Sequence, residues 1–314
     1  MPADAKLGAL MEAMESHAAE NFTQIDRVVS WNSLGLGERY GAWSDFARDR
    51  QAIPEQTEAI EWTTATDLSG KCRLVPFACV SMDLTTRLGT GLERTTNGLA
   101  AGFELGSARM AALMELIERD AVTAWRTSDL VSRMKCTINL ADLRFEWLQG
   151  WLAKLRAAGS TLQCYAVPSF TGMPVVAAEL SDLSKGTKAY RAIEGSAAHP
   201  LPHIALLRAV SEVIQGRCAY VAGSRDDMMP KDYESKVGAV QMVFGLPLPP
   251  SMVPVALSSI PEGCQSLSDL CGIIEHAGLG PVMFVDVGRV GDIHVVKAFA
   301  AGFGNRLKLR RTVQ

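Results

Sequence analysis

The chain has 314 residues, of which 48% are hydrophobic and 21% are charged. This composition excludes a disordered tail, a collagen-like repeat and a low-complexity chain. Because 31 Lys and Arg residues nearly balance 34 Asp and Glu residues, for a formal net charge of −3, the chain has no overall positive field that would gather nucleic acid. We therefore expect a protein with a large buried core and no nucleic-acid partner.

The sequence lacks the segments that would place a protein in a membrane. It contains no run of about 18 apolar residues, and its first residues carry charges instead of an apolar signal region. The seven cysteines are scattered and form no Cys-x-x-Cys pair, so they are expected to be reduced thiols and not zinc ligands. We expect a soluble, cytoplasmic protein without a membrane partner.

Hydrophobic periodicity predicts helices and strands along the whole chain. The helices are expected at residues 5–22, 105–125, 143–158 and 202–222, and the strands at 60–65, 72–82, 161–168, 173–180, 281–287 and 293–299. Residues 23–57 are predicted to form loops and short helix, and the Gly-containing residues 95–102 a loop. This alternation is typical of the α/β or mixed α+β class. About 150 residues per domain would give two domains, but we expect one large domain over residues 1–314.

One short pattern occurs three times. Residues 9–15 read ALMEAME, residues 112–118 read ALMELIE and residues 209–215 read AVSEVIQ. Residues three apart share a helix face, so each copy directs two acceptor-bearing side chains the same way. A single Glu-x-x-Glu pair is usually a solvated surface. Here the small and apolar neighbours of the motifs predict buried helix faces, which favours a shared site.

Carboxylates on buried faces need cations, because an unpaired buried charge is costly. Arg119 and Arg208 are too few to neutralise the five glutamates of the motifs, which are Glu12, Glu15, Glu115, Glu118 and Glu212. Divalent ions bound by carboxylate oxygens solve this problem, and Mg²⁺ usually arrives with substrate phosphates. The residues alone therefore predict a site for Mg²⁺ and phosphate.

Arginines are expected to bind the phosphate oxygens. Arg119 directly follows Glu118, and Arg208 precedes Glu212 by one helical turn, so both can present their forked donors to phosphate. Arg225 is a further candidate, and the alternative for it is an exposed turn charge paired with Asp227. The sequence contains no Walker A loop, so if nucleotide binds, we expect it to do so through the acidic helices.

Longer stretches around the motifs resemble the YcaO family. Residues 95–122, TTNGLAAGFELGSARMAALMELIERDAV, resemble the family's central signature, expected over about 95–125. Residues 194–227, EGSAAHPLPHIALLRAVSEVIQGRCAYVAGSRDD, resemble its C-terminal signature, and residues 5–20 resemble its first acidic helix. The resemblance implies a YcaO-type domain with repeated acidic helices on a mixed β-sheet. It also implies ATP and Mg²⁺ as cofactors and phosphorylation of a peptide amide oxygen, which a nucleophile then replaces.

Carried over to this chain, the resemblance makes the five motif glutamates the ligands of Mg²⁺ and nucleotide, with Arg119 and Arg208 as phosphate contacts. Glu115, Glu118 and Glu212 are the predicted catalytic residues. The predicted nucleotide-binding set is Glu12, Glu15, Arg119, Arg208, Gln215 and Arg225.

The chain also departs from the family pattern. Phe103 stands where the family usually has Asn, and Ser107 and Met110 replace an acid and a polar residue, so some nucleotide contacts are expected to differ. The first acidic helix follows only a few residues, whereas family members carry a strand and a Gly-Lys-Gly loop before it. We expect either a truncated chain or an incomplete ATP site.

The end of the chain points to a subgroup. Azoline-forming members tend to end in a Pro-x-Pro-x-Pro tail, whereas this chain ends in NRLKLRRTVQ, which resembles members that pair with a TfuA protein and make thioamides. We therefore expect thioamide formation on a ribosomally made peptide or protein, with a TfuA-like partner and a homodimer left open. The alternatives are azoline cyclodehydration of Cys, Ser or Thr, and a degenerate, non-catalytic member that binds a peptide or a partner enzyme.

Overall fold

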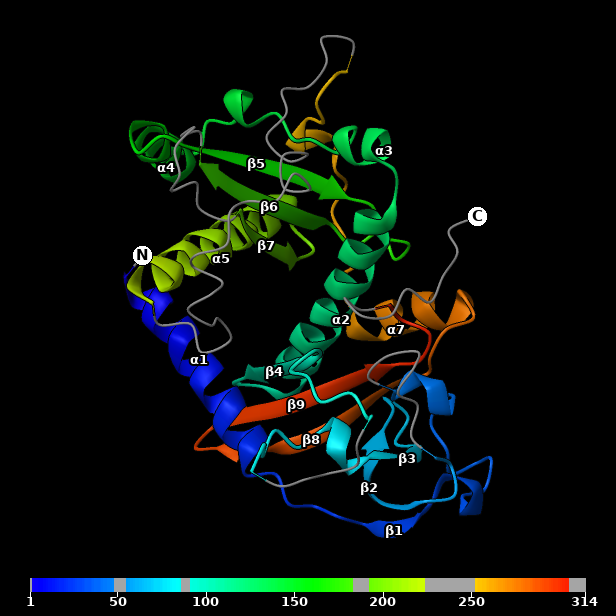
Figure 1. Cartoon of the computed structure of the whole chain (residues 1–314). Helices are drawn as coiled ribbons and strands as arrows, with labels where there is room; N and C mark the ends of the chain where they lie inside the picture. The colour runs from blue at the N-terminus through cyan, green and yellow to red at the C-terminus, as the bar shows by residue number, and fades with distance from the viewer. Residues whose placement is uncertain (1, 48–54, 86–90, 183–191, 224–251, 305–314) are drawn as a thin grey trace. The chain divides into compact units, whose positions relative to one another are not determined.

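The computed structural model describes residues 2–47, 55–85, 91–182, 192–223 and 252–304 (Figure 1). The chain divides into two compact units. Unit 1 is Met1–Thr123 with Cys264–Gln314, and unit 2 is Ala124–Gly263. The single domain expected over residues 1–314 stays a prediction.

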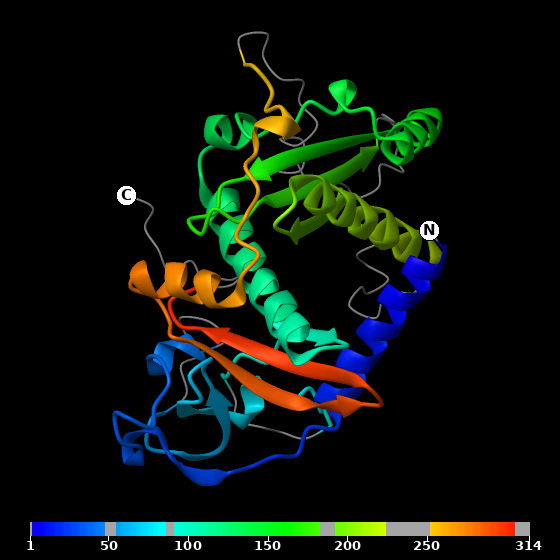
Figure 2. The same ribbon diagram turned by 180° about the vertical axis from the view of Figure 1, so that it is seen from behind.

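The described part of unit 1 contains a six-stranded sheet with the order β1-β2-β8-β9-β4, in which β3 also pairs with β2. The strands are β1 (Arg27–Ser30), β2 (Ala59–Thr66), β3 (Cys72–Pro76), β4 (Leu99–Gly102), β8 (Val282–Val290) and β9 (Ile293–Ala300). The hairpin of β8 and β9 (Figure 2) joins β2 on one side to β4 on the other. Two strands from the C-terminal part of the chain, β8 and β9, therefore lie between β2 and β4, which come from its first third.

Three α-helices belong wholly or mainly to unit 1: α1 (Pro2–Glu20), α2 (Leu105–Thr127), whose last turn extends into unit 2, and α7 (Leu267–His276). α1 packs on β4, β8 and β9, and α7 contacts β8. Short 3-10 turns occur at Trp31–Ser33, Trp43–Asp45 and Phe77–Cys79. Trp31, Trp43 and Trp62 fill the core, with ring centroids 5.3 to 6.1 Å apart. Their burial supplies a large part of the apolar contact that holds this unit.

In its described residues, unit 2 contains a three-stranded sheet with the order β5-β6-β7. The elements are α3 (Leu130–Met134), α4 (Glu146–Ala157), β5 (Ser160–Val167), β6 (Val175–Asp182), β7 (Ile193–Ala198) and α5 (Pro202–Ala222), with 3-10 turns at Leu140–Asp142 and Leu257–Ser259. α5 packs on β6 and β7, and α4 packs on β5. Pro202 begins α5, where its missing N–H costs nothing, and Gly223 ends it with φ 64°.

The mixed class of helices and strands expected from the sequence is confirmed, and the ladders between the described strands are antiparallel. The sheets are therefore of the α+β kind and not mixed in strand direction. The helix predicted at 202–222 has the observed bounds, and the helix expected at 105–125 ends two residues later.

Two predictions about loops are wrong. Residues 95–102 contain β4, which consists of Leu, two Ala and Gly and forms because it pairs with β9. Residues 23–57 contain β1, which is held by pairing with β2. Neither segment has the β-branched pattern of a strand throughout, so long-range pairing decides the structure. β7 and α7 were also not predicted.

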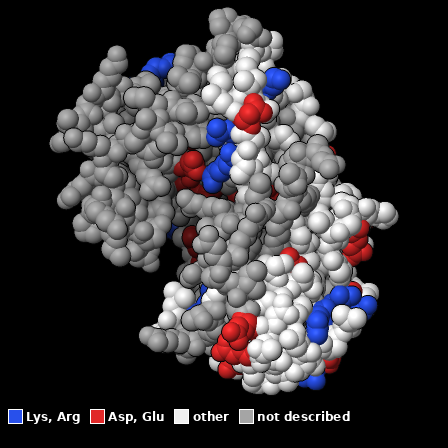
Figure 3. All heavy atoms as spheres, turned by 45° about the vertical axis from the view of Figure 1, so that its right-hand side comes forward, with Lys and Arg blue, Asp and Glu red and all other residues white. Residues whose placement is uncertain are grey.

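On the face shown in Figure 3, Lys and Arg side chains lie interspersed with Asp and Glu side chains. None of the described helices combines the length and apolar character needed to cross a membrane.

A buried carboxyl lies in the sheet of unit 2. Glu179 on β6 is 4% exposed and accepts a hydrogen bond of 2.9 Å from Ser181 Oγ. The pKa of Glu179 is raised to about 7, mainly by burial and also by the negative charge of Glu194, opposite it on β7. The Ser181 hydrogen bond and the charges of Arg126 and Arg133 lower the pKa and only partly offset burial. The sheet therefore carries an acid that ionises near neutral pH.

Gly98 is held where only glycine fits. Its φ is +75°, and a Cβ there would lie 2.7 Å from the carbonyl oxygen of Ala298 and 2.9 Å from Leu116 Cδ2. The Ala298 N–H also donates to the Gly98 carbonyl at 2.8 Å. The loop before β4 therefore packs closely on both β9 and α2.

We predict that Glu179→Gln makes stability less dependent on pH. A carboxyl whose pKa is raised by folding binds protons more tightly in the folded state, so wild-type stability falls as pH rises from about 4.5 through 7. The variant should be more stable than wild type by about 3 kcal/mol at pH 8, with the difference shrinking towards pH 5. Urea unfolding at both pH values measures this, with the exposed Glu262→Gln as control. Equal pH slopes in wild type and Glu179→Gln would contradict the assignment.

We also predict that Gly98→Ala lowers the free energy of unfolding by about 1 to 3 kcal/mol, because a Cβ adds both backbone strain and overlap. Gly106→Ala is the matched control, since a Cβ in this first turn of α2 meets nothing within 4 Å. Alanine there should raise stability by up to about 1 kcal/mol. Denaturant unfolding compares the two variants, and equal stability would show that the loop yields to a side chain.

Candidate functional site

Two motif glutamates of unit 1 bind to the backbone of one short segment. The N–H of Ala101 donates to Glu15 Oε1 at 2.7 Å, and the N–H of Gly98 donates to Glu115 Oε2 at 3.2 Å. Glu15 comes from α1 and Glu115 from α2. Residues 98–101 therefore bring the first and second acidic motifs to one place.

The carboxylates gathered there repel one another. The pKa of Glu15 is raised to about 7, mainly by burial and also by the charges of Glu115 and Glu12, while the Ala101 N–H opposes the rise. Burial also raises the pKa of Glu115, and Arg119 and Lys297 oppose that rise. Oxygen ligands with excess negative charge match the preference of a hard divalent cation. Glu12, Glu15 and Glu115 therefore have the ligand chemistry that Mg²⁺ prefers.

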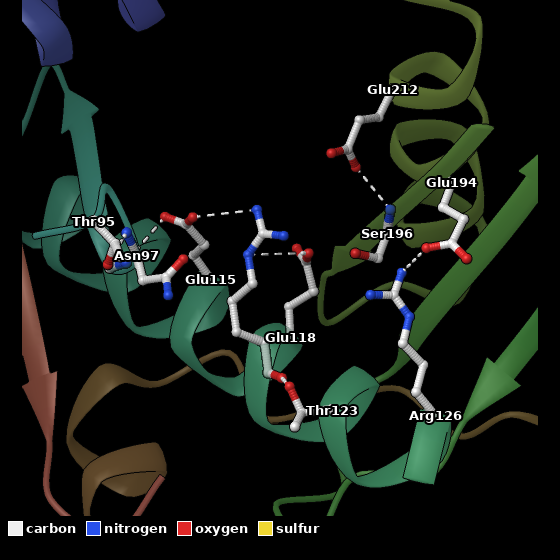
Figure 4. Close-up of polar contacts among 11 residues, drawn as sticks. Thr95, Asn97, Glu115, Glu118, Thr123, Arg126, Glu194, Ser196 and Glu212 are labelled. Carbon is white, nitrogen blue, oxygen red and sulfur yellow. Dashed lines mark hydrogen bonds and ion pairs between the residues drawn. The ribbon is translucent and has the colours of Figure 1, made fainter. Parts of the chain in front are cut away.

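Arg119 links the two glutamates of the second motif. Its Nη2 lies 3.5 Å from Glu115 Oε1, and its Nε lies 3.9 Å from Glu118 Oε1 (Figure 4). The Glu118 side chain is 10% exposed, whereas the Arg119 side chain is 39% exposed. Arg119 therefore offsets part of the negative charge and still reaches solvent, where it could meet a phosphate oxygen.

The third motif has its own backbone anchor, within unit 2. The N–H of Ser196 on β7 donates to Glu212 Oε2 at 2.7 Å (Figure 4). Gly195 makes this approach possible, because a Cβ there would lie 2.8 Å from the Ala209 carbonyl and 2.9 Å from the Val213 nitrogen. The glycine of the EGS sequence thus lets α5 lie close to β7 and fixes Glu212.

The buried helix faces expected around the motifs are only partly present. Glu118 is buried at 7% exposure, in agreement with the prediction. Glu12, Arg208, Glu212 and Gln215 are exposed, so that expectation is wrong for them. On α5 the small residues Ala205 and Ala209 pack into the core of the sheet, and the motif side chains occupy another face of the helix.

The predicted site residues divide between the units. Unit 1 contains Glu12, Glu15, Glu115, Glu118 and Arg119, and unit 2 contains Arg208, Glu212 and Gln215. Arg225 lies outside the described residues. In the described ranges, no group of three or more His, Cys, Asp or Glu side chains is arranged so that it could hold a metal ion. The five-glutamate site stays a prediction.

One charged residue near this cluster was not predicted. Lys297 on β9 is 3% exposed, and its ammonium donates to the carbonyl oxygen of Thr95. Burial lowers the pKa of Lys297 to about 8, and Cys79, Glu115 and Glu93 oppose that change. The sequence offered one sign of this residue, a single lysine in the otherwise nearly apolar strand IHVVKAFA. A lysine that is buried in such a strand rarely occurs without a specific partner.

Lys297 and Arg119 line the same small cavity of about 90 Å³ in unit 1. Thr95 and Asn97, from the segment before β4, line it as well. The cavity is therefore lined both by residues of α2 and by residues of β9, all within unit 1.

Comparisons with known proteins identify the family of the chain. Residues 1–304 match the family described as YcaO cyclodehydratase, ATP- and Mg²⁺-binding. The chain is 30% identical over 255 residues to a protein from the tfuA 3′ region of Rhizobium leguminosarum bv. trifolii, covering 77% of this chain and 59% of that protein. It spans only about three fifths of the length of the curated relatives that it matches first.

Solved structures show the same fold. A heterocyclase in complex with substrate and cofactor has a TM-score of 0.74 and 22% identity, covering 96% of this chain and 44% of that chain. The YcaO protein from Methanopyrus kandleri, bound with AMPPCP and Mg²⁺, has a TM-score of 0.69 and 22% identity, covering 96% of this chain and 77% of the other. The chain therefore belongs to the YcaO family, described as ATP- and Mg²⁺-binding, as the sequence of its acidic helices predicts.

Proposed function

We propose that this chain uses Mg-ATP to activate a backbone amide in a ribosomally made peptide or protein, for conversion to a thioamide. The amide oxygen takes the γ-phosphoryl group, a sulfide donor adds to the amide carbon, and the oxygen leaves as phosphate. The observation that carries the proposal is the group of Glu12, Glu15 and Glu115, in which burial, together with the repulsion between these carboxylates, raises the pKa of Glu15.

ATP would supply the phosphoryl group, and the Mg²⁺ bound with it would supply the positive charge that neutralises these carboxylates. In this chain Glu12, Glu15, Glu115, Glu118 and Glu212 would hold the metal. Arg119, Arg208, Gln215 and Arg225 would contact the nucleotide. The backbone N–H groups of Gly98, Ala101 and Ser196 orient three of the carboxylates before any ligand arrives, which lowers the cost of binding.

Two reactions share this activation step. The relative from the tfuA 3′ region favours thioamide formation with a TfuA-like partner protein. The family description and the heterocyclase structure favour azoline cyclodehydration, in which a Cys, Ser or Thr side chain attacks the activated amide. We place thioamide formation first because the relative with that gene neighbour is 30% identical, whereas the heterocyclase is 22% identical and shows the fold. A homodimer is compatible with either reaction.

Mass spectrometry of the product decides between the reactions. We predict that cells expressing the chain with a TfuA-like protein contain a peptide that is heavier by about 16 mass units, because sulfur replaces oxygen. Accurate mass separates this change from oxidation, and cells expressing Glu118→Gln serve as control. A loss of about 18 mass units would instead identify cyclodehydration, since that reaction removes water.

We predict that Glu115→Gln lowers ATP turnover at least about 100-fold without unfolding the protein. The amide keeps the shape of the side chain but removes an anionic oxygen, which weakens a site for a hard cation. Glu118→Gln and Glu212→Gln are expected to behave alike. Phosphate release measures turnover, and the exposed Glu104→Gln, just before α2, is the matched control.

Thermal unfolding of each variant verifies that the fold persists. Phosphate release at the wild-type rate in Glu115→Gln would contradict its role. Calorimetric titration with Mg-ATP distinguishes the degenerate alternative, because a non-catalytic member that binds only a peptide or a partner enzyme gives no heat of nucleotide binding.

A further inference from the structure

Lys297 occupies a position that normally calls for an apolar residue. It pairs in register with Leu99 across β4 and β9, and its neighbours Val296 and Ala298 are buried at 0% and 2% exposure. Placing an ammonium there is unfavourable unless specific partners compensate. The partners are the Thr95 carbonyl oxygen and the negative charges of Glu115 and Glu93.

Two residues of β9 form hydrogen bonds to the segment before β4. The Lys297 ammonium binds the carbonyl of Thr95, and the N–H of Ala298 donates to the carbonyl of Gly98 at 2.8 Å. Between these points the N–H of Leu99 donates to the Thr96 carbonyl at 2.8 Å, which closes a turn. The Gly98 N–H is then left pointing at Glu115 Oε2.

We propose that Lys297 is a positioning residue for nucleotide binding: it fixes residues 95–98 and places a positive charge close to Glu115, so that the Gly98 amide holds this carboxylate in its binding orientation. The proposal rests on the proposed function in one respect, the role of Glu115 in binding Mg²⁺ with nucleotide. Lys297 acts through the segment and through Glu115, and it does not itself contact the reacting atoms.

The first test is nucleotide binding by Lys297→Met, which keeps the length and apolar stem of the side chain but removes the charge. Calorimetry with Mg²⁺ and a non-hydrolysable ATP analogue should give a dissociation constant at least about tenfold higher than wild type, as expected for the loss of a charge-assisted hydrogen bond. Val296→Ala is the control, because it lies next to Lys297 but on the opposite face of the sheet. It should lower the melting temperature and leave the dissociation constant within about twofold.

A second variant separates lost charge from lost packing. Lys297→Ala leaves room for a small amine beside the cavity that Lys297 lines. Added n-butylammonium should bring the dissociation constant back to within about threefold of wild type, whereas n-butanol, of similar size but neutral, should not. Wild-type affinity in folded Lys297→Met, or equal rescue by both additives, would overturn the proposal.

Hydrogen exchange provides a readout that needs no ligand. The amides of residues 98–101 should exchange at least about tenfold faster in Lys297→Met than in Val296→Ala, because local opening of the segment becomes easier. If the wild-type protein binds no Mg-nucleotide, the proposed function fails, and this measurement alone decides the role of Lys297. Unchanged exchange in Lys297→Met would then refute the positioning role.

Discussion

Backbone amides that bind glutamates are the interaction on which the candidate site depends. Each of the three acidic helices sends one carboxylate to an N–H group in or next to a strand: Glu15 to Ala101, Glu115 to Gly98 and Glu212 to Ser196. Such charge-assisted bonds contribute about 1.5 to 3 kcal/mol each. In unit 1 they fix Glu15 and Glu115 against their mutual repulsion, and in both units they require strands placed where helices can reach them.

The amides that bind these glutamates lie in or next to two strands, β4 and β7, whose sequences have low intrinsic strand preference. β4 contains only Leu, Ala and Gly, yet its pairing with β9 holds the Ala101 amide towards Glu15 of α1 and the preceding Gly98 amide towards Glu115 of α2. β7 contains Gly195, whose missing side chain allows α5 to approach. In both places small residues permit close backbone contact at some cost in intrinsic strand preference. Packing constraints and site geometry are thus met by the same residues.

Sequence reasoning found the acidic motifs because helical spacing is a local property. α5 was predicted with its observed bounds, and α2 to within two residues, since apolar periodicity and terminal residues identify long helices. β4 and β1 were missed because they depend on partners about 200 and 30 residues away. Lys297 was missed for the same reason. Its lysine stands out in β9, but only the fold reveals that Thr95 and Glu115 lie beside it.

The two oxygens of the Glu115 carboxylate have different partners, and this difference affects how a cation would bind. In Glu115 the amide of Gly98 engages Oε2, while Oε1 forms only a loose pair with Arg119 at 3.5 Å. The anchored oxygen fixes the plane of the carboxylate, and the other oxygen remains in a contact that a stronger cation can replace. Arg119 would then be released from part of its charge pairing and become available to a phosphate oxygen. In the function proposed above, Mg²⁺ would replace Arg119 at Glu115, and the Arg119 guanidinium would then pair with a phosphate oxygen of the same nucleotide.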